Sequence, residues 1–329
     1  MCWPTTPADR RRTGSALLAV LWLSAALAAI AFAVANSVRT ESERASTHAE
    51  GVRAYFLAAG AVDRALLYML WGGGLRNPDG SPRYYAPPVT HLRFAFPAGE
   101  AVVEIIPESA KMNVNASPPE DLLRLVLAAG APPEQAQTIV QAIVDWRTPA
   151  PSGLPTLLDQ YYLSLKPSFR ARHASFEEIE ELLLVRGMTA ELFYGGYHPE
   201  PGGRLIPHGG LRDCLSVYGA TSQFDVNTAD PVLLAAVGLS PVQVAAVVEA
   251  RSRMPFRDTQ QLAMFGPAAA RLRVGGDTFF TLRATAQPRL SGGQLSGTRR
   301  SVAALLKFLP RDYTDRYHIL RWYDDVWVR

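Results

Sequence analysis

The side chains that could carry out covalent or metal chemistry are scattered along this sequence of 329 residues. No stretch matches a G-x-S-x-G nucleophile motif, a phosphate-binding loop or an H-E-x-x-H metal motif. The two cysteines, Cys2 and Cys214, lie too far apart in sequence to suggest a metal motif. The six histidines are equally dispersed: His48, His91, His173, His198, His208 and His318. We therefore predict that the protein is not an enzyme.

The strongest signal is a membrane-spanning helix near the N-terminus. Three arginines at residues 10–12 precede Gly14, and residues 15–38 then carry no ionisable side chain. Roughly 20 helical residues, each rising about 1.5 Å, cross the hydrocarbon core of a bilayer, so this segment is long enough to span one. The arginines favour a cytoplasmic N-terminus. Residues 39–329 should then lie across the membrane.

A cleaved secretory signal peptide is the alternative interpretation, because Ala33-Val34-Ala35 matches an A-x-A cleavage site. The apolar run is, however, longer than the usual h-region of about 7–15 residues. An apolar helical stripe also continues beyond it, until Gly72 to Gly74 end the pattern. Its members are Val52, Tyr55, Phe56, Ala59, Val62, Leu66, Met69 and Leu70. We predict one helix over residues 16–71, roughly 80 Å long.

The start of this helix carries a resemblance to a known family. A short basic leader that ends at Gly14, followed by the apolar stretch Ser15–Leu23, resembles the class III leader of type IV pilins and pseudopilins. The resemblance implies that a prepilin peptidase cleaves between Gly14 and Ser15 and methylates the amine of Ser15. Most members of this family have a glutamate at the fifth mature position, where this chain has Ala19. That replacement is typical of the K-type minor pseudopilins of type II secretion.

Further motifs extend the similarity to K-type minor pseudopilins over most of residues 10–235. These motifs are Lys111–Ala116, Ile143–Arg147, Tyr161–Leu165 and Phe176–Thr189. The resemblance implies a single-pass protein of the bacterial inner membrane, with a cytoplasmic N-terminus and a periplasmic C-terminal domain. It would act at the pseudopilus tip, where it would initiate pseudopilus assembly and support protein export.

The same resemblance implies the partners. They are the minor pseudopilins of types I and J, the major pseudopilin, the inner-membrane secretion platform and the prepilin peptidase. Helices of neighbouring subunits are expected to pack on Val52, Phe56, Ala59 and Leu66. A minor pilin of a type IV pilus or competence system shares the leader and the long helix, and it remains an alternative.

Calcium is the one candidate cofactor, because K-type relatives hold calcium in their helical domain. Asp145 in the motif Asp145-Trp146-Arg147 and the following acid, Asp159, are the candidate ligands. Calcium binds six to eight oxygen ligands, several of them carboxylates. Asp159 is the only acid between Arg147 and Tyr161, so the sequence offers few of the ligands that the site would need.

An internal repeat raises nucleic-acid binding as a second alternative. Asn113–Pro118 resembles Asp225–Asp230, and a helical hairpin follows each segment, as in the helix-hairpin-helix units of DNA-binding proteins. The hairpins at Gly130 and Gly238 lack the second glycine that lets backbone N–H groups meet phosphate. Cleavage after Gly14 would leave 30 basic and 29 acidic residues, which gives no general attraction to nucleic acid. We predict that no nucleic acid is bound.

The predicted fold class is α+β. A long N-terminal helix packs on a small antiparallel sheet, as in pilins, and a mostly helical domain, similar to SAM-like or helix-hairpin-helix folds, is inserted. We expect strands at 92–96, 101–106, 278–286, 301–308 and 317–323, and helix caps at Ser117, Ser175 and Ser240. The predicted divisions are a leader (1–14), a transmembrane helix (15–38), an amphipathic helix with the first strands (39–108), the helical insertion (109–270) and the last strands (271–329).

Overall fold

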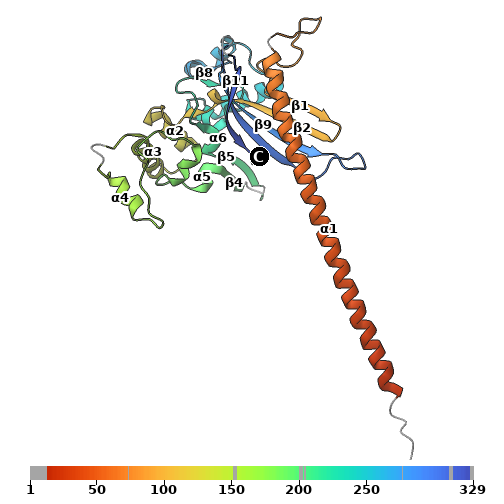
Figure 1. Cartoon of the computed structure of the whole chain (residues 1–329). Helices are drawn as coiled ribbons and strands as arrows, with labels where there is room; N and C mark the ends of the chain where they lie inside the picture. Colours follow the sequence, from red (N-terminus) through yellow and green to blue (C-terminus); the bar gives the residue numbers. More distant parts are fainter. Residues whose placement is uncertain are drawn as a thin grey trace, which may run out of the picture.

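A computed structural model describes residues 13–72, 74–150, 154–199, 203, 205–275, 277–310 and 314–326. Its longest element is α1, a single helix from Thr13 to Gly72 that projects far beyond the rest of the molecule (Figure 1). The other elements form a body around the C-terminal part of this helix. Residues 1–12, which include the three arginines of the predicted leader, lie outside the described residues.

Five antiparallel strands form the main sheet, in the order β1-β2-β9-β10-β11. The strands are β1 (His91–Phe96), β2 (Gly99–Pro107), β9 (Phe279–Pro288), β10 (Arg300–Phe308) and β11 (Tyr317–Tyr323). β9 lies in the centre, where Ala284 pairs with Val103 of β2 and with Val302 of β10. The first hairpin is thereby joined to strands almost two hundred residues away. All five predicted strands are confirmed, to within two residues at each end.

Helix α1 packs on the sheet through a face of alanines. Ala54, Ala58, Ala61 and Ala65 lie three or four residues apart and have no exposed surface. Opposite them lie apolar side chains that point to one face of the sheet: Val103, Ile105, Leu282, Ala284, Ala286, Val302, Ala304 and Leu306. Small side chains on both surfaces let the helix backbone approach the strands closely. The predicted combination of a long apolar helix and an antiparallel sheet is confirmed.

Residues between β2 and β9 form a mostly helical region on the other face of the sheet (Figure 1). Its helices are η1 (Glu108–Ala110), α2 (Pro119–Ala128), α3 (Pro133–Arg147), α4 (Leu157–Leu163), η3 (Ile179–Leu184), α5 (Ala190–Tyr194), α6 (Leu211–Cys214), α7 (Pro231–Ala236), α8 (Pro241–Arg253) and η4 (Thr259–Arg271). Its strand pairs are parallel β3 (Met112–Asn113) with β6 (Leu215–Ser216), antiparallel β4 (Gly195–Pro199) with β5 (Leu205–Gly209), and parallel β7 (Phe224–Asp225) with β8 (Leu272–Arg273).

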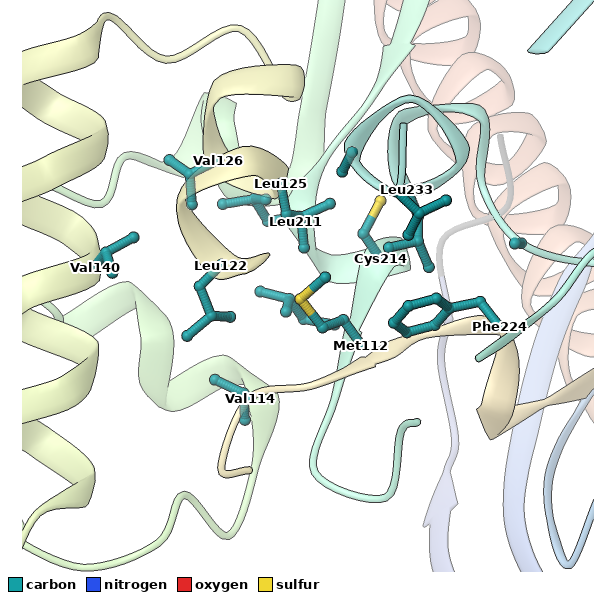
Figure 2. Close-up of a cluster of buried hydrophobic side chains, with 14 of the residues drawn as sticks. Met112, Val114, Leu122, Leu125, Val126, Val140, Leu211, Cys214, Phe224 and Leu233 are labelled. Carbon is teal, nitrogen blue, oxygen red and sulfur yellow. The ribbon is translucent and has the colours of Figure 1, made fainter. Parts of the chain in front are cut away.

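One continuous core holds the helical region together. Figure 2 shows how side chains from distant segments meet in it: Leu125 of α2, Leu233 of α7 and Phe224 of β7 converge around Met112 and the buried Cys214. Each of these five side chains is at most 1% exposed. Both predicted repeats contribute to this core, so the two repeats pack against each other.

The helix caps agree only partly with the sequence-based prediction. Ser240 caps α8 as expected, because its hydroxyl accepts from the Gln243 N–H at 3.3 Å. The caps predicted at Ser117 and Ser175 are wrong. Pro118, between Ser117 and the first residue of α2, is the N-cap. A residue before proline is driven into the extended region, so Pro118 takes the cap position and has no side-chain acceptor to offer.

Candidate functional site

The apolar N-terminal part of α1 lies outside the folded body and is exposed along its whole described length. Every residue from 16 to 49 is exposed, and the most apolar 18-residue window of this helix has a mean hydropathy of 2.5. Leu21, Trp22 and Ile30 are each more than 60% exposed. Apolar side chains that are exposed to water cost free energy, whereas the same side chains are stable in the hydrocarbon core of a bilayer. Within the described residues, α1 is the helix that is long and apolar enough to cross a membrane.

The four residues predicted to pack on partner helices lie in two different environments. Val52 is 42% exposed and Phe56 is 68% exposed, while Ala59 is half-buried. These three lie on the side of α1 that faces away from the sheet. Leu66 is only 4% exposed and belongs to the core between α1 and the sheet. The structure therefore leaves Val52, Phe56 and Ala59 for partner packing and removes Leu66 from that surface.

The candidate calcium ligands, Asp145 and Asp159, lie on either side of Thr156. The Thr156 hydroxyl donates to Asp145 Oδ2 at 3.2 Å, and the Thr156 backbone N–H donates to Asp159 Oδ2 at 3.0 Å. The other oxygen of Asp159 accepts from the Ala171 N–H at 3.1 Å. Asp159 is thus the acidic member of the capping box that begins α4.

A histidine side chain lies directly beside Asp159. His173 Nε2 lies 2.8 Å from Asp159 Oδ2, and Nδ1 lies 3.2 Å from each of the carbonyl oxygens of Asp145 and Thr148. Burial alone would lower the pKa of His173, but the carboxylate and the two carbonyls outweigh it and raise the pKa above its ordinary value. Both ring nitrogens can then donate at once, as an imidazolium does.

This arrangement does not fit a calcium site. Calcium requires oxygen ligands in large number, whereas both oxygens of Asp159 already accept hydrogen bonds and the neighbouring side chain, His173, offers nitrogen atoms instead of oxygens. Across the part of the chain that the structure describes, no three His, Cys, Asp or Glu side chains group as metal ligands would. The pair Asp159–His173 connects the start of α4 directly to the chain that precedes η3.

The two sequence repeats share an arginine that sequence reasoning missed. Arg147, at the end of α3, donates to the carbonyl oxygens of Val114 at 2.7 Å and Ser117 at 2.9 Å. Arg251, near the end of α8, donates to Val226 at 2.9 Å and Ala229 at 2.7 Å. Each arginine fastens the second helix of a repeat to the loop before its first helix.

The asparagines of the two repeats also make matching contacts. The amide of Asn115 both donates to and accepts from the backbone of Phe176, at 3.0 and 2.7 Å. Asn227 does the same with Phe256, at 3.0 and 2.8 Å. In the first repeat, residues 148–175 separate the arginine from its phenylalanine, and in the second only a short link, 252–255, does so. The segment that contains α4, Asp159 and His173 is therefore an insertion in the first repeat.

The hairpins of the repeats are not arranged to receive a phosphate. The N–H groups at the first hairpin, Gly130 and Ala131, donate to Leu127 and Val126 of α2 at 2.9 and 3.2 Å. The corresponding groups at Gly238 and Leu239 donate within α7 in the same way, at 3.0 and 3.2 Å. A phosphate would have to displace these hydrogen bonds, and residues 109–147 carry four acidic against three basic side chains.

Glu108 connects the helical region to the sheet. Its carboxylate accepts from Lys111 Nζ at 3.0 Å, from the hydroxyl of Thr281 on β9 at 2.6 Å, and from the hydroxyl of Ser216 on β6. Burial would raise the pKa of this carboxyl, which is 2% exposed, but Lys111 and the two hydroxyls hold the pKa below its ordinary value. This network fixes the position of the helical region on the face of the sheet opposite α1.

Comparison with known families decides the identity of the chain. Two models described as "Type II secretion system (T2SS), protein K" match residues 102–194 and 224–297, and each range includes the start of one repeat. The chain belongs to this family. It is therefore a minor pseudopilin of type II secretion. Members of this family are structural components of the secretion system. The exposed apolar part of α1, together with the family, fits a single-pass membrane protein.

Relatives of known name agree with the protein K family. Type II secretion system protein K of Klebsiella pneumoniae is 26% identical over 269 residues, covering 76% of each protein. The protein of that name from Pseudomonas aeruginosa is 25% identical over 279 residues, covering 78% of this chain and 79% of the relative.

A solved structure shows the same fold. It is a chain in the GspK-GspI-GspJ complex from the type 2 secretion system of enterotoxigenic Escherichia coli, with a TM-score of 0.52 and 17% identity. The similarity covers 87% of this chain and 98% of that one. The protein K family assigns the chain to type II secretion, and the type IV pilus or competence alternative is set aside.

Proposed function

We propose that the chain acts at the pseudopilus tip, where it initiates assembly together with the minor pseudopilins of types I and J and supports protein export. The solved relative, which is crystallised with GspI and GspJ, supports this choice of partners. The single observation that carries the proposal is the exposed face of α1 around Phe56, which is 68% exposed on the part of the helix whose opposite side packs against the sheet. The major pseudopilin and the inner-membrane platform would contact α1 closer to its N-terminus.

The tip location is supported by the shape of the body and by Ala19. A subunit without an acid at this position has no charge to pair with the N-terminal amine of a neighbour. The two repeats and the insertion also widen the body beside the sheet (Figure 1). A second subunit stacked on top would have to avoid this bulk, so the position at the end of the filament is the one that accommodates it.

The proposed topology places residues 15–38 in the inner membrane, with a cytoplasmic N-terminus and a periplasmic body. A prepilin peptidase would cleave between Gly14 and Ser15 and methylate Ser15. Both residues lie in the first turn of α1. We assign the two repeats as SAM-like or helix-hairpin-helix-like units that have a packing role and do not bind nucleic acid. The matching arginine and asparagine contacts of the two repeats support this assignment.

Complementation of secretion tests the proposal. We expect deletion of the gene to leave exported proteins in the periplasm, and a plasmid copy to return them to the medium. A plasmid copy with Phe56→Asp should fail to restore secretion although its body remains folded, because a carboxylate on this face opposes apolar packing. Normal secretion by the deletion strain would contradict the proposed function.

A further inference from the structure

An uninterrupted stripe runs along the outer face of α1 from the membrane span to the body. It consists of Val38, Ser42, Ala45, Ala49, Val52, Phe56, Ala59 and Asp63, and we call it the outer stripe. Its members alternate four and three residues apart, which is the spacing of positions that face a partner in a coiled coil. All are exposed except Ala59, which is half-buried. At the next position of the pattern, Leu66 turns into the core of the body, and the stripe ends.

Four charged residues beside the stripe form two ion pairs. Arg39 bonds Glu43 at 2.9 Å, and Arg44 bonds Glu41 at 2.8 Å. The polar segment between membrane and body therefore keeps small or apolar side chains on one face. Because the stripe is continuous with the membrane span on a single helix, its occupant must run along α1 from the same bilayer. A neighbouring helix of the same kind meets this requirement.

Asp63 is the exception on this surface. It lies one heptad after Phe56, in the position where a coiled coil expects an apolar residue. Within the described residues Asp63 has no ion pair or hydrogen bond from its side chain. The adjacent cation, Arg64, lies over the rings of Tyr68 and Phe94 at 5.5 and 4.9 Å from their centroids and points to the sheet side. Among the residues that the structure describes, no side chain pairs with the exposed carboxylate of Asp63.

We propose that Asp63 selects the helix that packs on the outer stripe, favouring a neighbour that presents Lys or Arg at this level and disfavouring a second copy of this chain. The inference rests on the proposed function. In a parallel pair of two identical chains in register, Asp63 would face Asp63, and like charges in an apolar interface are destabilising. A single polar residue at such a position sets register and partner choice at a cost in stability.

Co-purification from membranes tests the role of Asp63. The full chain, tagged at its C-terminus, is produced with the I-type and J-type minor pseudopilins of the same organism, and the partners recovered from detergent extracts are quantified at low and high salt. We expect Asp63→Lys to reduce recovery about tenfold at low salt and Asp63→Asn about threefold. Asp315→Lys, on the loop before β11, serves as the matched control and should change recovery little. Changing the facing Lys or Arg of the partner to Glu should restore recovery by Asp63→Lys.

Self-association gives a second readout. With Ala45→Cys as the cross-linking position, we expect few disulfide-linked dimers of the otherwise unchanged chain, and several-fold more when Asp63→Asn is added. The inference would be overturned if both Asp63 variants recovered as much of the partners as the unchanged chain does. The proposed function would still stand if Phe56→Asp abolished recovery of the partners in the same experiment. Failure of the unchanged chain to recover either partner would instead contradict the proposed function itself.

Discussion

Arg147 and Arg251 occupy equivalent places in the two repeats, and each bridges two backbone carbonyls of the loop before the first helix of its repeat. The carbonyls come from corresponding positions, Val114 with Val226 and Ser117 with Ala229. Because a guanidinium presents several N–H groups in a fixed plane, one side chain can serve both acceptors. The duplication therefore extends from the sequence pattern to individual hydrogen bonds.

Loss of either arginine should destabilise the helical region. We expect Arg147→Ala and Arg251→Ala each to lower the free energy of unfolding by about 2–4 kcal/mol, because two carbonyl acceptors lose charged donors. Lysine should rescue poorly, since it is a point donor without the planar geometry. The exposed Arg253, whose side chain is 78% exposed, provides the control, and Arg253→Ala should cost at most about 0.5 kcal/mol. Equal effects of all three alanine substitutions in chemical denaturation would contradict this.

Glu108 should make stability depend on pH in the acid range. Its pKa in the folded chain lies below the ordinary value of 4.5, so its contribution is complete above that pH and is lost as the pH falls through the folded-state pKa. Glu108→Gln should therefore flatten the loss of stability below about pH 4.5 and cost about 2–4 kcal/mol at neutral pH. Glu120→Gln, at an exposed position in α2, should reproduce neither effect. Identical acid-unfolding curves for Glu108→Gln and the unchanged chain would disprove the role of this network.

Calcium should not stabilise the chain. Because His173 and two backbone N–H groups already satisfy Asp159, we expect the melting temperature to be the same in chelator and in millimolar calcium. His173→Ala should lower the free energy of unfolding by about 1–3 kcal/mol, since it leaves a buried carboxylate with one partner fewer. His318→Ala, at an exposed position on β11, is the control. A melting temperature that rises with calcium in the unchanged chain would show that the insertion binds the ion after all.

Sequence patterns revealed the elements whose signals are local. The charge-free run of residues 15–38 and the stripe that follows it predicted α1. Alternating apolar residues predicted the first strand of the main sheet and a run rich in valine and isoleucine the second, and the other three strands were also predicted from their segments. The repeat was also detectable, because Asn113–Pro118 and Asp225–Asp230 are similar at the level of residues. Each of these patterns depends on neighbours within one segment.

What the sequence did not reveal depends on contacts between distant segments. Phe176 lies 61 residues from Asn115, whereas Phe256 lies 29 residues from Asn227, so the insertion hid their equivalence. His173 bonds an aspartate 14 residues away through a bend in the chain that no periodicity predicts. Leu66 fitted the apolar stripe of α1, but the stripe alone could not decide which members face the sheet and which face a partner.

The mature N-terminus tests the membrane-anchored pseudopilin most directly. The full chain is produced with the prepilin peptidase of its host, purified from membranes, and its N-terminal peptide is identified by mass spectrometry. We predict a chain that begins at Ser15 and carries one methyl group on the terminal amine. A soluble periplasmic chain that begins at Asn36, after cleavage at Ala35, would remove α1 from the membrane and contradict the proposed topology.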